Sequence, residues 1–155
     1  VQITTLREWK AAGRTRYIGA STSSDQQYAA FEQTMREEAM DVVQVDYALD
    51  NRNAAERILP LAADRGMGVF VNLPFGRGRL FQAVQGKPLP EWTKDLDCRS
   101  WAQFFLKYIV SHPAVTCAVP GTAQVKYVTD NLGAAQGRMP DAATRTRMEQ
   151  FIDAL

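Results

Sequence analysis

Residues 42–47 read VVQVDY, an apolar run of strand length that carries polar side chains, Gln44 and Asp46, toward its carboxyl end. Two similar runs, RYIGAS at 16–21 and GVFVN at 68–72, place the three starting points 26 residues apart. A fourth run, AVTCAV, occupies residues 114–119. Short apolar runs of this kind predict buried strands.

Helical patterns fill the intervals between these strands. They cover residues 25–38, 54–65, 100–110 and 124–135, with a first helix at 3–12 and a closing amphipathic helix at 141–155. Asp25 and Ser100 are expected to cap their helices, because their side chains can accept from free backbone N–H groups. Residues 76–97 interrupt the rhythm, and their glycines and prolines predict an ordered excursion loop.

Strands that alternate with helices predict an α/β fold of parallel βα units, and the near-continuous apolar runs predict a sheet covered on both faces. We expect residues 1–155 to form a single domain. A complete (β/α)8 barrel takes about 250 residues, so the chain is too short for one. Two architectures stay open on periodicity alone: a parallel half-barrel (βα)4 with an extra C-terminal helix, or a small doubly wound sheet.

Composition excludes several classes of function. Hydrophobic residues make up 46% of the chain, charged residues 23%, and the net charge is +1, which argues against a nucleic-acid surface. No apolar run reaches the roughly 20 residues of a membrane helix, and no secretory leader follows Val1. We therefore expect a soluble protein, either cytoplasmic or exported. Cys98 and Cys117 are compatible with free thiols or a disulfide, and no metal-ligand spacing occurs.

Polar side chains follow each predicted strand at its carboxyl end, where parallel α/β folds bind ligands. A polar group in an apolar strand needs a hydrogen-bonding partner, which is either another part of the protein or a ligand. Amide and hydroxyl groups suit a carboxamide or a sugar hydroxyl rather than acid–base chemistry. Asp46 is the only carboxylate among them, and His112 lies in a turn at the opposite end of the sheet, where we expect a structural role.

Five segments carry a family resemblance. In chain order they are KAAGRTRYIGAS (10–21), VVQVDYAL (42–49), DRGMGVFVNLPFGRGRL (64–80), LKYIVSHPAVTCAVPGT (106–122) and VTDNLGAA (128–135). This series resembles the second half of an aldo/keto reductase over residues 6–139. The family is a (β/α)8 barrel that reduces carbonyls with NADPH. The resemblance implies that this chain supplies the last four βα units.

The resemblance also implies a cofactor site. Ser21 and Gln44 match positions that hold the nicotinamide carboxamide, Thr22 replaces the usual Asn, and Asn72 replaces an aromatic ring. The positions matching the pyrophosphate loop are Phe75, Gly76 and Gly78, and those matching the adenosine end are Thr122, Gln124, Asp130 and Asn131. The implied cofactor is NADP, with NAD as the alternative.

Two departures concern the adenosine end of this implied site. Gly121 and Tyr127 stand where many members carry Lys and Arg that hold the 2′-phosphate, and Lys126 is an adjacent substitute.

The family's catalytic Asp, Tyr, Lys and His come from the first half of the barrel, which this sequence does not match. The prediction is therefore a fragment or half-barrel that carries the nicotinamide-cofactor side of an oxidoreductase, without a catalytic residue of its own. The alternative is a non-catalytic half-barrel that self-assembles as a binding or interaction module. Because exposed strand edges recruit partners, we expect a homo-oligomer or a complementary half-barrel, and neither nucleic acid nor membrane.

Overall fold

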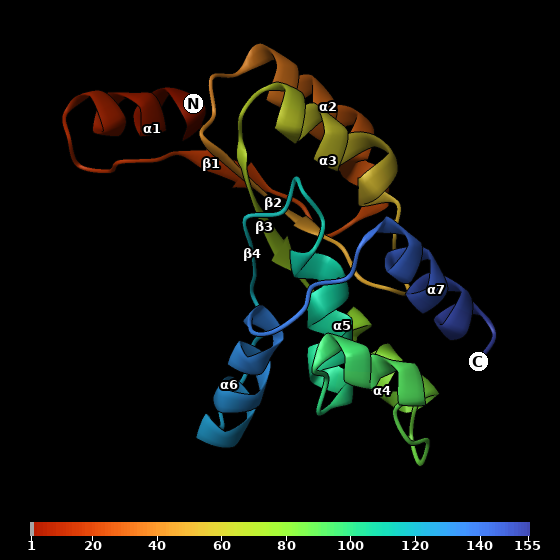
Figure 1. Cartoon of the computed structure of the whole chain (residues 1–155). Coiled ribbons are helices and arrows are strands. Elements are labelled where there is room, and N and C mark those ends of the chain that lie inside the picture. The colour runs from red at the N-terminus through yellow and green to blue at the C-terminus, as the bar shows by residue number, and fades with distance from the viewer. Residues whose placement is uncertain (1) are drawn as a thin grey trace.

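A computed structural model describes residues 2–155, except for the side chain of Gln2; Val1, the first residue of the predicted domain, lies outside the described residues. The elements and their bounds in chain order, with η marking short 3-10 helices, are α1 (Gln2–Ala11), β1 (Gly19–Ser21), η1 (Asp25–Gln27), α2 (Tyr28–Glu37), β2 (Val42–Asp46), α3 (Ala54–Asp64), β3 (Gly68–Asn72), η2 (Gly76–Gly78), α4 (Arg79–Ala83), η3 (Glu91–Leu96), α5 (Trp101–Val110), β4 (Cys117–Ala118), α6 (Val125–Leu132), η4 (Gly133–Ala135) and α7 (Ala142–Asp153) (Figure 1). The predicted excursion loop at 76–97 thus contains η2, α4 and η3.

The four strands form one parallel sheet in the order β1-β2-β3-β4. Each strand pairs with its neighbour in sequence, so the strand order shows no reversal. A doubly wound sheet needs such a reversal, and that alternative is therefore wrong. The parallel half-barrel is confirmed, with α1 beyond β1 and α6 beyond β4 at the two ends of the arrangement (Figure 1).

Only one face of this sheet is fully covered. Burial alternates along β2 and β3, so that Val43, Val45, Val69 and Val71 are fully buried under the helices, whereas Phe70 on the other face is half-buried. The prediction of a sheet covered on both faces is wrong for this chain. In a complete barrel the second face would be the interior, which needs strands from the other half to fill it. We call this second face the open face.

The two outer strands are shorter than predicted. β1 begins at Gly19 instead of residue 16, and β4 comprises only Cys117 and Ala118 instead of residues 114–119. An edge strand pairs on one side only, so fewer hydrogen bonds hold its ends in the ladder. Single bonds still continue the β4 pairing beyond the strand, from Thr116 N to Val69 O (2.9 Å) and from Val119 N to Val71 O (2.8 Å).

Helix caps were predicted correctly in one case and wrongly in another. The Ser100 hydroxyl accepts from Gln103 N and caps α5, as expected. Asp25 does not cap a helix, because it is the first residue of η1 and its carboxylate accepts from the Asn53 side chain (3.0 Å) instead. The N-cap of α7 is Asp141, whose carboxylate accepts from Thr144 N (2.8 Å).

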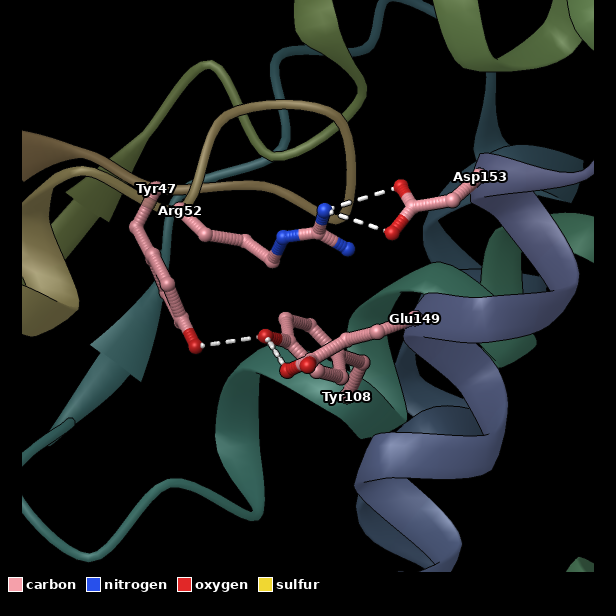
Figure 2. Close-up of polar contacts among 5 residues, drawn as sticks. All are labelled: Tyr47, Arg52, Tyr108, Glu149 and Asp153. Atoms are coloured by element: carbon pink, nitrogen blue, oxygen red, sulfur yellow. Dashed lines mark hydrogen bonds and ion pairs between the residues drawn. The ribbon is translucent and has the colours of Figure 1, made fainter.

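Polar contacts anchor α7 to the rest of the fold, as Figure 2 shows. The Tyr47 hydroxyl donates to that of Tyr108 (3.0 Å), which donates to Glu149 of α7 (2.5 Å). Arg52 binds Asp153 through both carboxylate oxygens (2.8 and 2.9 Å). The last helix is therefore held against α5 by buried and part-buried hydrogen bonds, against the β2–α3 loop by an exposed ion pair, and by apolar packing of Met148.

Cys98 and Cys117 are both free thiols, and burial raises the pKa of Cys98 to about 11. Within residues 2–155, no cluster of three or more His, Cys, Asp or Glu side chains is suited to hold a metal ion. None of the described helices is long and apolar enough to cross a membrane.

Candidate functional site

The strand ends place Ser21 and Gln44 together on the open face. These two residues are partners in the β1–β2 register, and Gln44 is in turn the partner of Phe70. Register partners point to the same side of a sheet. Together with Phe70, their side chains line a hollow of about 590 Å³ that also borders α1. The structure therefore brings together the hydroxyl and amide groups that the sequence singles out on the first two strands.

Thr22 behaves differently from Ser21. It is buried, with 5% of its surface exposed, and its hydroxyl contacts Ser24 O (3.2 Å) and the Gln27 side chain (2.8 Å). Its backbone N–H donates to Gln44 O (2.9 Å), which continues the pairing of β1 with β2. The Thr22 hydroxyl therefore has its hydrogen-bond partners inside the protein, and these bonds connect the end of β1 to η1.

Asn72 lies at the end of β3, and only one of its two polar side-chain atoms has a hydrogen-bond partner among the described groups. Its Nδ2 donates to the backbone carbonyl of Thr22 (3.1 Å), whereas its Oδ1 is buried and has no hydrogen-bond partner among the described groups. Its register partner is Asp46, two residues beyond Gln44, so the register assigns Asn72 to the open face with Gln44 and Ser21. A buried acceptor without a donor is uncommon in native proteins and calls for an explanation.

Asp46 has its partners inside the protein. It is buried, and its carboxylate accepts from the Tyr28 hydroxyl (3.1 Å) and from the Asn51 amide (2.6 Å). Burial and the Asp46 charge raise the pKa of Tyr28 well above its usual range, so this phenol keeps its proton. The arrangement stabilises the strand end, and the two side chains that contact the carboxylate are a phenol that keeps its proton and an amide, neither of which suits acid–base chemistry.

The loop after β3 is shaped by two glycines. Gly76 has a φ of 55°, and a Cβ at this position would lie 2.3 Å from an Asp50 carboxylate oxygen. Gly78 has a φ of 92° and open space around it. Asp50 also accepts from Arg79 Nε (2.9 Å). The backbone at Gly76 therefore packs closely against the Asp50 carboxylate, a contact that the sequence does not reveal.

A second hollow joins the loop after β3 to the β4–α6 turn. This groove has a volume of about 460 Å³ and is lined by Phe75, Phe81, Ser100, Trp101, Ala102, Gly121, Thr122, Tyr127, Asp130 and Asn131. Four of the predicted site residues therefore meet there: Phe75, Thr122, Asp130 and Asn131. Gln124 precedes α6 as an exposed N-cap residue and does not line the groove, and neither do Gly76 and Gly78.

Asp130 fixes one wall of this groove. Its carboxylate accepts from the Ser100 hydroxyl (2.7 Å) and from the Gln103 amide (2.8 Å), which also contacts the Asp130 carbonyl (3.0 Å). These bonds join the start of α5 to α6. Both carboxylate oxygens are thus held by neighbouring side chains.

Two aromatic residues of the groove, Phe81 and Trp101, are absent from the set that the sequence singles out. Residues 100–110 predict an apolar helix, and that pattern does not separate a core tryptophan from one that lines a groove. The Trp101 indole donates to Lys87 O (3.0 Å), so a contact 14 residues away sets the orientation of the ring. Only the folded excursion loop at 76–97 brings this partner into place.

His112 lies apart from these groups. Its ring packs edge-on against Tyr47, with centroids 5.7 Å apart, and its Nδ1 accepts from Ala114 N (3.2 Å). Burial, followed by the nearby Arg145 charge, lowers the pKa of His112. The strand ends and the groove therefore offer amides, hydroxyls and aromatic faces, which suit binding of a polar planar molecule better than proton transfer.

Comparisons with known proteins agree with the parallel βα fold. Among solved structures, an aldo-keto reductase from Klebsiella pneumoniae in complex with NADP and acetate matches with a TM-score of 0.77 and 20% identity, over 97% of this chain and 53% of its own. The holo form of an aldo-keto reductase from Bacillus halodurans matches with a TM-score of 0.74 and 21% identity, over 97% of this chain and 54% of its own.

At this level of identity the solved structures show the fold, and the chain spans about half the length of each. Membership is shown at the level of sequence, because the model of the aldo/keto reductase family matches residues 2–149, which is nearly the whole chain. With its four parallel strands, this chain belongs to the aldo/keto reductase family and corresponds to about half of the barrel.

Proposed function

We propose that this chain binds a nicotinamide dinucleotide and forms the cofactor side of a carbonyl-reducing oxidoreductase. The resemblance implies NADP(H), and NAD(H) is the other candidate. The observation that carries the proposal is the buried Oδ1 of Asn72, which has no donor among the described groups. The carboxamide of nicotinamide offers N–H donors that fit this acceptor.

The neighbouring side chains fit the same group. Ser21 and Gln44 share the open face with Asn72, so a hydroxyl and a second amide lie on the same side of the sheet. Thr22 contributes through its backbone carbonyl, which accepts from Asn72 Nδ2 and fixes the amide plane (3.1 Å). When bound, the dinucleotide would supply a hydride, and these residues would orient its carboxamide.

Carbonyl reduction also needs a proton donor, which we assign to a partner half-barrel. The family's catalytic Asp, Tyr, Lys and His belong to the half that this sequence does not match. The chain by itself is therefore expected to bind the cofactor without reducing carbonyls. No residue of this chain is proposed as catalytic.

The surface of α6 supports the proposal of such a partner. Three apolar residues of this amphipathic helix are exposed: Val125 (81%), Val128 (44%) and Leu132 (64%). Val128 and Leu132 line a hollow together with Cys117 and Ala118 of β4, and an exposed strand edge with apolar surroundings favours association. We propose that a complementary half-barrel or a second copy of the chain covers this surface.

Titration of the purified chain with NADPH and NADH, followed by calorimetry or nicotinamide fluorescence, tests cofactor binding. Saturable binding without turnover of an aldehyde is expected. Rapid aldehyde reduction by the chain alone would contradict the assignment of catalysis to a partner.

Light scattering tests the association. A dimer or larger assembly is expected at micromolar concentration, and Val125→Lys should weaken it. Ala29→Lys, which adds the same charge at an exposed position of α2, is the matched control and should leave assembly unchanged. A stable monomer of the unmodified chain would rule out self-association.

A further inference from the structure

The groove between the excursion loop and the β4–α6 turn has preformed aromatic walls. Its four aromatic residues are Phe75, Phe81, Trp101 and Tyr127. The Trp101 ring lies nearly parallel to those of Phe105 and Phe151, at 22° to each, and its indole nitrogen is held by Lys87 O. Phe75 and Phe81 contact each other with centroids 4.9 Å apart. Such fixed flat surfaces favour stacking of a planar ring.

The charges of the groove have one sign. Asp130 is the only ionisable carboxylate in the lining, and no lysine or arginine of the described chain is part of it. The two groups that donate to the Asp130 carboxylate, the Ser100 hydroxyl and the Gln103 amide, are neutral, so they do not cancel its charge. The nearest cation on the same helix, Lys126, is exposed, and its Nζ lies 4.8 Å from the centroid of the Tyr127 ring.

A phosphate group bound here would find no arginine or lysine side chain among the lining residues. Tight phosphate sites use arginine, lysine or several free backbone N–H groups, because charge-assisted bonds compensate for the lost hydration. The one formal charge among the lining residues is the Asp130 carboxylate, and two negative charges in one groove repel each other. Neutral polar groups remain available, namely the Thr122 hydroxyl and the Asn131 amide.

The geometry points to a groove that takes the adenosine end of NAD(H) and discriminates against NADP(H). This inference rests on the proposed function and decides between its two candidate cofactors. The two dinucleotides differ by a single phosphate on the adenosine ribose. The aromatic walls hold the adenine ring equally in both, so the preference depends on the lack of a cation among the lining residues, Lys126 lying on the Tyr127 ring outside the lining. Tyr127, which lines the groove from α6, is the specificity-determining position.

Calorimetric titration of the full 155-residue chain with NAD⁺ and NADP⁺ measures this preference directly. NAD⁺ is expected to bind about tenfold more tightly, the ratio that corresponds to about 1.4 kcal/mol of discrimination. Adenosine 5′-monophosphate and adenosine 2′,5′-bisphosphate, which isolate the adenosine end, are expected to rank in the same order.

Tyr127→Arg adds a cation to the groove wall and is expected to raise NADP⁺ affinity about tenfold, with little change for NAD⁺. The matched control is Thr129→Arg, which adds the same charge to an exposed position about 200° around the helix from Tyr127. It is expected to leave both affinities unchanged. Because Tyr127 is 49% exposed, its replacement should not disturb folding, which circular dichroism can check.

The possible outcomes separate this inference from the proposed function. If the unmodified chain binds NADP⁺ as tightly as NAD⁺ or more tightly, the inference is overturned and cofactor binding stands. A loss of NADP⁺ affinity in Lys126→Met, without a matching loss for NAD⁺, would likewise overturn it by assigning the phosphate to Lys126. If neither dinucleotide binds, the proposed function fails, and the inference fails with it.

Discussion

Asn72 at the end of β3 donates a hydrogen bond from its side-chain amide to the backbone carbonyl of Thr22 just beyond β1, at 3.1 Å and across 50 residues of sequence. The bond spans the carboxyl end of β2, which lies between these two strands. It fixes the amide plane while the Oδ1 atom stays buried, with no partner in residues 2–155. The feature of the sheet best suited to meet a ligand is therefore held in place by the sheet itself.

Asn72→Leu is expected to lower the affinity for the nicotinamide dinucleotide roughly three- to tenfold, because one hydrogen bond to the ligand is lost. Stability should change by less than about 1 kcal/mol, since the buried acceptor is removed together with the Thr22 bond. Calorimetric titration and urea unfolding measure the two effects. Asn53→Leu, which also loses one side-chain hydrogen bond but at an exposed site, should leave affinity unchanged. Equal losses in both variants would remove Asn72 from the binding site.

Gly76→Ala is expected to cost more stability than Gly78→Ala. Both residues have positive φ, so alanine introduces left-handed strain of about 1 kcal/mol at either position. Only at Gly76 would the new methyl group also collide with Asp50, 2.3 Å away, and the total loss should exceed about 2 kcal/mol. Chemical denaturation of the two variants provides the comparison. Equal losses would mean that the Asp50 carboxylate moves away freely.

Tyr108→Phe should destabilise the chain by about 1–3 kcal/mol, because both hydrogen bonds of the hydroxyl are lost. Without the Tyr108 hydroxyl, Glu149 loses a hydrogen-bond donor and the Tyr47 hydroxyl loses its acceptor; Figure 2 shows both bonds. Tyr17→Phe is the control, since Tyr17 is 66% exposed and should change stability by less than about 0.5 kcal/mol. Urea unfolding followed by circular dichroism measures both. If Tyr108→Phe were as stable as the control, α7 would not depend on this contact.

The contact between α1 and the start of β2 is expected to weaken in acid. The Lys10 ammonium bonded to Asp41 (2.5 Å), and next the Ile18 N–H (2.9 Å), hold the pKa of Asp41 below its ordinary value of 3.8. Because the folded pKa is the lower one, this stabilisation is present above pH 3.8 and is lost as the pH falls through the folded pKa.

Asp41→Asn should therefore reduce the dependence of unfolding free energy on pH below that value. Urea titrations at several pH values compare the slopes of the two proteins. An unchanged acid slope in Asp41→Asn would show that other carboxylates dominate.

The sequence carries enough local information for the order and type of the elements. The 26-residue spacing of the first three apolar runs predicts three of the strands, and β3 occupies the predicted residues 68–72. Ser100 caps α5 as predicted, because capping involves atoms only three residues apart. Strand lengths at the edges and the covering of only one face could not be predicted, since both depend on which elements pack nearby.

For the candidate site, the sequence by itself determined which polar residues lie toward the carboxyl ends of the first three strands: Ser21, Gln44, Asp46 and Asn72. Only the tertiary structure decided that Thr22 is hydrogen-bonded internally, that the side-chain oxygen of Asn72 has no partner among the described residues, and that Trp101 and Tyr127 line the same groove. The physical reason is the range of the interactions. Periodicity and capping act over a few residues, whereas the pairing of buried polar atoms depends on contacts between elements far apart in the chain.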